Sequence, residues 1–112
     1  MDIHTLNDLL AQMSEKGNKY FEFIRVPALS VGVYRLEAGA KDEQRPHSED
    51  EVYYVIKGQA KFDRAGKVQE VRPGSILFVQ RGVEHRFLDI TRELVLLVVF
   101  GPAENSLAPD EQ

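Results

Sequence analysis

The segment that decides the fold is residues 46–58, which read PHSEDEVYYVIKG. Its second half alternates as a β-strand does, because successive strand side chains point to opposite faces. Glu51, Tyr53 and Val55 share one face of this predicted strand, and the opposite face also carries apolar and aromatic side chains. A strand with two such faces is typical of a barrel, in which one face points to the interior and the other to a covering layer. Residues 57–58, Lys-Gly, are expected to close the strand.

The rest of the chain reads as short strands separated by turns. A hairpin is expected at Ala65-Gly66. A turn is expected at Arg72-Pro73-Gly74, where proline presets φ and glycine accepts a positive φ. The predicted strands cover residues 20–26, 29–36, 51–56, 60–64, 67–71, 75–80, 85–90 and 93–100.

One amphipathic helix is predicted ahead of these strands. Thr5 or Asn7 is a suitable cap, and Gly17 is a suitable stop. We expect the helix to cover one edge of the fold. A helix followed by seven or eight short strands indicates an all-β sandwich or barrel rather than alternating βαβ units. The apolar positions at helical spacing are Leu6, Leu9, Leu10 and Met13.

Length and composition narrow the class of protein. The 112 residues, 43% of them hydrophobic, suit a single domain with one core. We expect a helical region over residues 1–17, a barrel over 18–101 and a flexible tail over 102–112. The net charge of −4 argues against a nucleic-acid binder, and the absence of cysteine excludes disulfides and thiolate metal sites. No signal peptide is visible and the longest apolar run has seven residues, so a cytoplasmic protein without a membrane partner is expected.

Two histidines and one glutamate beside the predicted strands are candidate metal ligands. His47 and Glu51 lie in the segment quoted above, and His85 opens a later predicted strand. Two neutral imidazoles and a carboxylate suit a borderline divalent cation and leave coordination positions open. Pairing of the two strands, a hypothesis about topology, would bring the three together. In the alternative interpretation, residues 49–51 are a solvated acidic turn. His4, near the chain end, is expected to take no part.

The spacing of these residues resembles the two motifs of the cupin superfamily, small β-barrels of the jelly-roll type. The first motif is a glycine, five residues, His-x-His, three or four residues, Glu, six residues and a glycine. Residues 39–58 match this spacing, with RPH at 45–47. The second motif is a glycine, five residues, Pro-x-Gly, two residues, His, three residues and Asn, and residues 74–89 match it with QRG at 80–82. The resemblance extends over about residues 18–101 and implies an all-β, RmlC-like jelly-roll barrel.

Three positions depart from the cupin motifs. Arg45 stands where the family usually has its first histidine, and Gln80 and Asp89 replace a proline and an asparagine whose roles are structural. The resemblance therefore implies three metal ligands instead of four, with Gln44 or Glu49 as an additional oxygen if the loop is locally re-registered. Such a set could hold iron(II), manganese, nickel, zinc or copper. The three implied ligands are His47, Glu51 and His85.

Arg45 also bears on the substrate. A guanidinium facing a divalent cation would repel it, so Arg45 is expected to point elsewhere or to bind an anionic substrate group. Arg45, Tyr53 and Phe87 are the candidates for lining a substrate pocket. A third option is that the site has lost its metal.

The resemblance implies several functions. The first is a metal-dependent small-molecule enzyme, with dioxygenase-type chemistry favoured over isomerase-type chemistry and no catalytic residue assigned. The second is a non-catalytic module that binds or senses a metal and a small ligand. The third, a metal-free sugar-nucleotide isomerase, is disfavoured by the short chain and the acid-rich motif. A homodimer is expected, because small jelly-rolls expose strand edges and apolar sheets. Its contacts are expected at residues 20–26, residues 29–36 or the helix.

Overall fold

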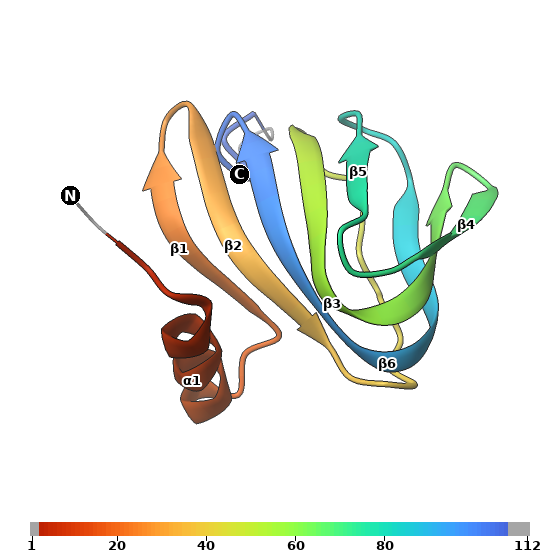
Figure 1. Ribbon diagram of the computed structural model, residues 1–112. Helices are drawn as coiled ribbons and strands as arrows, with labels where there is room; N and C mark the ends of the chain where they lie inside the picture. Colours follow the sequence, from red (N-terminus) through yellow and green to blue (C-terminus); the bar gives the residue numbers. More distant parts are fainter. Residues whose placement is uncertain (1–2, 108–112) are drawn as a thin grey trace.

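The computed structural model describes residues 3–107, so residues 1–2 of the predicted helical region and 108–112 of the predicted tail lie outside it. One helix precedes six antiparallel strands (Figure 1). No helix in the described part of the chain is both long and apolar enough to cross a membrane. The elements are α1 (Leu6–Lys16), β1 (Tyr20–Val26), β2 (Leu29–Leu36), β3 (Asp50–Arg64), β4 (Lys67–Val71), β5 (Ile76–Val79) and β6 (His85–Gly101).

Two long strands, β3 and β6, form the spine of one curled sheet. The strand order is β1-β2-β6-β3-β4, and β5 pairs with the first half of β3. β3 and β6 pair antiparallel from Asp50 opposite Gly101 to Arg64 opposite His85. Their register shifts three times between residues 55 and 61, and bulges of this kind bend a strand and increase its twist. The bent sheet therefore wraps around an interior, which is the concave side in Figure 1.

The interior is filled by alternate strand side chains, as the sequence predicted. Tyr53 is fully buried, whereas its neighbour Tyr54 is 43% exposed on the outer face. The centre is aromatic: the rings of Phe62 and Phe87 lie 4.7 Å apart, and Tyr53 meets Phe87 edge-on at 5.1 Å. Burying an apolar side chain of this size contributes roughly 1.5–3 kcal/mol, so this cluster is a main source of stability.

Helix α1 has the predicted caps and packs on the outer face of the sheet. The hydroxyl of Thr5 accepts a hydrogen bond from the Asp8 amide at 3.3 Å, and Gly17 ends the helix with a φ of 68°. A second, smaller hydrophobic cluster therefore lies outside the curled sheet, beneath the helix. Its buried members are Leu9, Met13, Val33 and Val95.

The prediction that β3 ends at Gly58 is wrong, because β3 continues to Arg64. Gly58 marks a close approach of β3 to β6: its φ is +107°, and a Cβ there would overlap the carbonyl group of Glu93. Only glycine tolerates both conditions, so a residue that looked like a turn is part of a bulge. β6 is likewise one strand where two were predicted, since Asp89, with a φ of 49°, bends it without ending its pairing with β3.

Residues 102–107, which belong to the predicted tail, form hydrogen bonds with distant parts of the chain. The Glu49 carboxylate accepts hydrogen bonds from the amides of Asn105, at 2.6 Å, and Leu107, at 2.9 Å. Backbone donors in a compact segment need such partners, because an unpaired buried amide is costly. No local pattern indicated this, since Glu49 lies 56 residues before Asn105.

Candidate metal centre and the adjoining cavity

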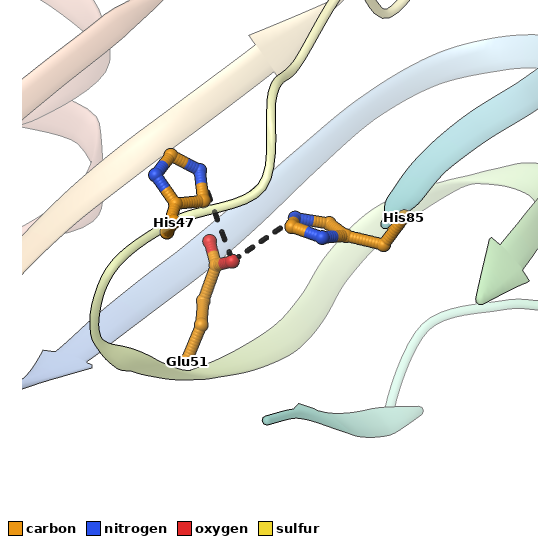
Figure 2. A group of neighbouring side chains, drawn as sticks. All are labelled: His47, Glu51 and His85. Carbon is orange, nitrogen blue, oxygen red and sulfur yellow. Dashed lines mark ion pairs between the residues drawn. The ribbon is translucent and has the colours of Figure 1, made fainter. Parts of the chain in front are cut away.

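The three predicted metal ligands meet at one point inside the curled sheet (Figure 2). His47 comes from the loop between β2 and β3, Glu51 is the second residue of β3, and His85 is the first residue of β6. One ligating atom from each residue lies within 4.8 Å of the other two. The loop is tied to this place because the amide of Gly82, just before β6, donates to the His47 carbonyl oxygen at 2.8 Å.

The Glu51 carboxylate is the buried centre of this group. Its side chain is 1% exposed, and Oε1 lies 3.1 Å from His85 Nε2 and 4.0 Å from His47 Nε2. Within residues 3–107, Oε1 nevertheless has no hydrogen-bond partner. Ligand atoms about 2.0–2.2 Å from a zinc-like ion lie roughly 3.0–3.5 Å from one another. A small inward movement of the imidazoles would therefore let the three residues hold one ion.

The surroundings of the two imidazoles set their protonation. His85 Nδ1 lies 2.9 Å from the Val83 carbonyl oxygen, so Nδ1 carries a proton and Nε2 faces Glu51. Burial lowers the pKa of His85, but the Glu51 carboxylate and the Val83 carbonyl outweigh it, and the pKa is raised. Burial lowers the pKa of His47, and the attraction of Glu51 does not restore it. His47 is thus the more readily neutral ligand, and His85 is the one that releases a proton to a metal.

A hydrogen-bonded network adds Gln44 to the site. Its Oε1 accepts the hydroxyl of Tyr53 at 2.8 Å and lies 3.4 Å from His47 Nε2. The same hydroxyl lies 3.1 Å from His85 Nε2. Gln44 Nε2 donates to Asp42 Oδ2 at 2.7 Å, which fixes the amide with its oxygen toward the histidines. Gln44 therefore presents a neutral oxygen to the candidate ligands.

Asp42 anchors this network, and sequence reasoning missed it. Its residue is 6% exposed, and its carboxylate accepts the Tyr34 hydroxyl at 2.7 Å and the Phe87 amide at 2.8 Å as well as the Gln44 amide. The residue lies in an irregular loop, where no periodicity indicates which side chains turn inward. Its bond to Phe87 also spans 45 positions, so no local signal could have found it.

A cavity of about 180 Å³ adjoins His47 and Glu51. Tyr53, a predicted pocket residue, lines it. The ring of Tyr20 reaches it by lying over Gly32, where a Cβ would overlap the Tyr20 hydroxyl. Because sites for drug-sized ligands measure roughly 300–1,000 Å³, this one suits a small organic molecule. Its other walls are Tyr34, Gln44, Val98, Phe100 and Glu104.

The remaining candidates lie apart from this cavity. Arg45 is exposed and lines a different cavity of about 450 Å³, which also borders His85. Phe87 is 1% exposed and belongs to the hydrophobic core. Glu49 is equally buried, but its carboxylate is committed to the backbone amides of residues 105–107. Of the two expected sources of an additional oxygen, the structure brings Gln44 to the site and ties Glu49 elsewhere.

Tyr20 and Glu104 are two further cavity residues that were not predicted from the sequence. Tyr20 pairs with Tyr34 across β1 and β2, and both were read only as strand residues. Their shared face could have been inferred from the alternation of those strands. Glu104 carried no such signal, since it falls in the segment predicted to be flexible.

Residues 32–100 match the cupin domain family. Over 105 residues the chain is 39% identical to the uncharacterized protein SCO3923 of Streptomyces coelicolor, with 94% of this chain and 100% of that protein covered. Both relations extend well beyond the two short motifs.

Several solved structures have the same fold. KdgF from a Halomonas species has a TM-score of 0.68 at 18% identity, covering 74% of this chain and 76% of that one. An RmlC-like cupin from Shewanella frigidimarina has a TM-score of 0.67 at 21% identity, covering 75% of each chain. The DMSP lyase DddQ from Ruegeria pomeroyi has a TM-score of 0.70 at 21% identity, covering 81% of this chain and 48% of that one. The predicted RmlC-like, mostly β fold with a short N-terminal helix is confirmed, and the chain belongs to the cupin family.

Proposed function

We propose that this cupin binds one divalent transition metal and acts on a small organic molecule held in the adjoining cavity. One observation carries the proposal: a buried carboxylate oxygen of Glu51 lies between two imidazole nitrogens and has no hydrogen-bond partner among the described residues. An unsatisfied buried charge is costly, and a metal ion bound at this oxygen would remove that cost. Two histidines and one carboxylate are also the donor set of open-sided metal sites.

The surrounding residues fit such an ion. The Val83 carbonyl orients His85 by accepting from Nδ1, which leaves Nε2 for the metal. Asp42 orients Gln44 in the same way, so its amide oxygen is available as a fourth, neutral ligand. Three or four protein ligands leave at least one coordination position open. We therefore assign the metal to His47, Glu51 and His85, with Gln44 as the additional oxygen.

The bound metal would supply Lewis-acid chemistry or the activation of dioxygen, and dioxygenase-type chemistry is the leading form of the proposal. The residues of the chain bind and orient the substrate. Burial and the Glu51 charge raise the pKa of Tyr53 well above its usual value, so its hydroxyl keeps its proton and donates a hydrogen bond to Gln44 Oε1 at 2.8 Å, which holds this amide oxygen beside the site. Phe100 packs edge-on against His47 at 4.8 Å between ring centroids and holds that imidazole against the cavity.

Metal analysis of purified protein tests the ligand assignment. The protein is stripped with a chelator and reloaded separately with iron(II), manganese, nickel, zinc and copper, and bound metal is counted by mass spectrometry. One ion per chain is expected in the unmodified protein, and little in His47→Ala, Glu51→Gln or His85→Ala. His4→Ala is the matched control, because His4 is exposed and its ring lies 5.0 Å from that of Phe23. Unchanged metal content in the His85 variant would refute the assignment.

A second measurement separates an enzyme from a binding module. Oxygen consumption and product formation are followed with the reloaded protein and a panel of small organic molecules, chosen by thermal-shift screening. Turnover that disappears in Glu51→Gln supports a metal-dependent enzyme. Binding without turnover after long incubation would instead favour the non-catalytic function.

A further inference from the structure

Glu104 and Tyr20 form one wall of the cavity beside the candidate metal centre. Glu104 is held by its backbone: its amide donates to the buried Ser30 hydroxyl at 2.9 Å, and its carbonyl accepts from Arg25 Nη2 at 2.8 Å. The residue after it is tied to Glu49 at 2.6 Å. These three hydrogen bonds fix the backbone around Glu104 and so fix where its side chain begins. The Glu104 side chain lines the cavity.

The Glu104 carboxylate lacks a strong partner among residues 3–107. Its side chain is 21% exposed, and the ionisable atom beside it is His47 Nδ1 at 3.7 Å, which is beyond hydrogen-bond distance. The neighbouring Arg25 is already engaged with Glu22 at 2.8 Å. A carboxylate in such a place is stabilised by a hydrogen-bond donor or a positive charge.

The other features of this wall favour the same kind of ligand. The Tyr20 hydroxyl is buried and has no hydrogen-bond partner in the described part of the chain. The rings of Tyr20 and Tyr34 lie edge to face at 6.2 Å and offer faces of the sort that attract cations. The described residues that line this cavity include no lysine or arginine. A carboxylate ligand would therefore find no positive side chain at this wall.

We propose that Glu104 and Tyr20 select a ligand that carries an ammonium or other N–H-rich head group. This inference rests on the proposed function, because the same cavity adjoins the metal centre. The expectation that Arg45 binds an anionic group concerns a different cavity, the one that Arg45 lines.

Three probes of equal chain length test this selectivity. Butylammonium, butanol and butyrate are titrated into metal-free protein at pH 7, and binding is followed by NMR chemical shifts of the amides around the cavity. Butylammonium is expected to bind about tenfold to a hundredfold more tightly than butyrate, the size of one hydrogen bond to a charged group. Glu104→Gln is expected to bring the ratio near one, and Tyr20→Phe to lower it less.

Glu22→Gln is the matched control, because Glu22 is a nearby carboxylate that pairs with Arg25 and does not line the cavity. It should leave the preference unchanged. Preference for butyrate, unchanged selectivity in Glu104→Gln, or no binding of any probe would overturn the inference. Because the probes are titrated into metal-free protein, this test is separate from the test of metal binding. If the protein binds no metal, the measured selectivity is unaffected, and if the selectivity is absent, metal binding is unaffected.

Discussion

Replacing Glu51 with glutamine is expected to stabilise the metal-free protein while removing its response to metal. At pH 9 both imidazoles of the site are expected to be neutral, so Glu51 is then a buried charge with an unpartnered oxygen. Leaving such a group unsatisfied costs about 1–3 kcal/mol, and glutamine keeps the shape while removing the charge. A gain of about 1 kcal/mol raises the Tm of a domain this small by about 4–8 °C.

The response to metal should change in the opposite direction. At a metal concentration of about 100 times Kd, the free energy of unfolding of the unmodified protein rises by about 2.7 kcal/mol. Glu51→Gln has lost the anionic ligand, so a gain of less than about 1 kcal/mol is expected at the same concentration. Thermal melts followed by circular dichroism measure both values: the metal-free proteins are compared at pH 9, and the response to zinc or manganese is measured at pH 7.5.

Glu49→Gln is the matched control for this experiment. Both glutamates are 1% exposed, but the Glu49 carboxylate is fully engaged by the amides of Asn105 and Leu107 and by the Ser48 hydroxyl. Its replacement should destabilise the metal-free protein by about 1–3 kcal/mol and leave the metal response in place. If Glu51→Gln instead lowers the Tm of the metal-free protein, Glu51 is a satisfied structural partner of His85, and the reasoning fails.

Three further predictions concern pH, backbone and assembly. Metal affinity should rise between about pH 6 and pH 8, because a bound ion must displace the proton that the raised pKa of His85 retains. Calorimetry in two buffers of different ionisation enthalpy counts the protons released. An affinity that does not change with pH would contradict the assignment of His85 as a ligand. In the metal-free protein the same raised pKa stabilises the fold at low pH, and this contribution is lost as pH rises through it. Gly58→Ala should lower the free energy of unfolding, measured with denaturant, by at least about 1–3 kcal/mol. Gly66→Ala should lower it less, because both glycines have a positive φ but only Gly58 lies against the Glu93 carbonyl group. Equal losses in the two variants would refute the close approach. Light scattering should give about twice the chain mass of 12.7 kDa if the expected homodimer forms, and 12.7 kDa would contradict it.

The sequence predicted what alternation and motif spacing encode. The alternation of side chains along residues 51–55 predicted that Glu51 and Tyr53 share a face, and both are buried inside the sheet. His85 and Phe87 were predicted to share a face of a later strand, and both are also buried. The meeting of Glu51 with His85 could only be a hypothesis about topology. In the register of the two strands, Glu51 lies opposite Phe100, and His85 lies opposite Arg64 at the far end of β3. The two come together because the bulged strands curl.

Long-range polar contacts were beyond the sequence. Glu49 and Glu51 are two positions apart, on the same face of an extended chain, yet one binds backbone amides and the other faces the metal site. The position of residues 105–107 decides which of the two glutamates binds backbone amides and which faces the metal site. Asp42 shows the same limit, because its partners are set by the loop conformation and not by any periodic pattern.

The most direct test of the metal centre is anomalous diffraction from crystals of the reloaded protein, measured at the absorption edge of the metal. The account predicts one peak per chain, about 2.0–2.2 Å from Nε2 of His47, Nε2 of His85 and a carboxylate oxygen of Glu51. A map without a peak at this position, or with the ion held by other residues, would contradict it.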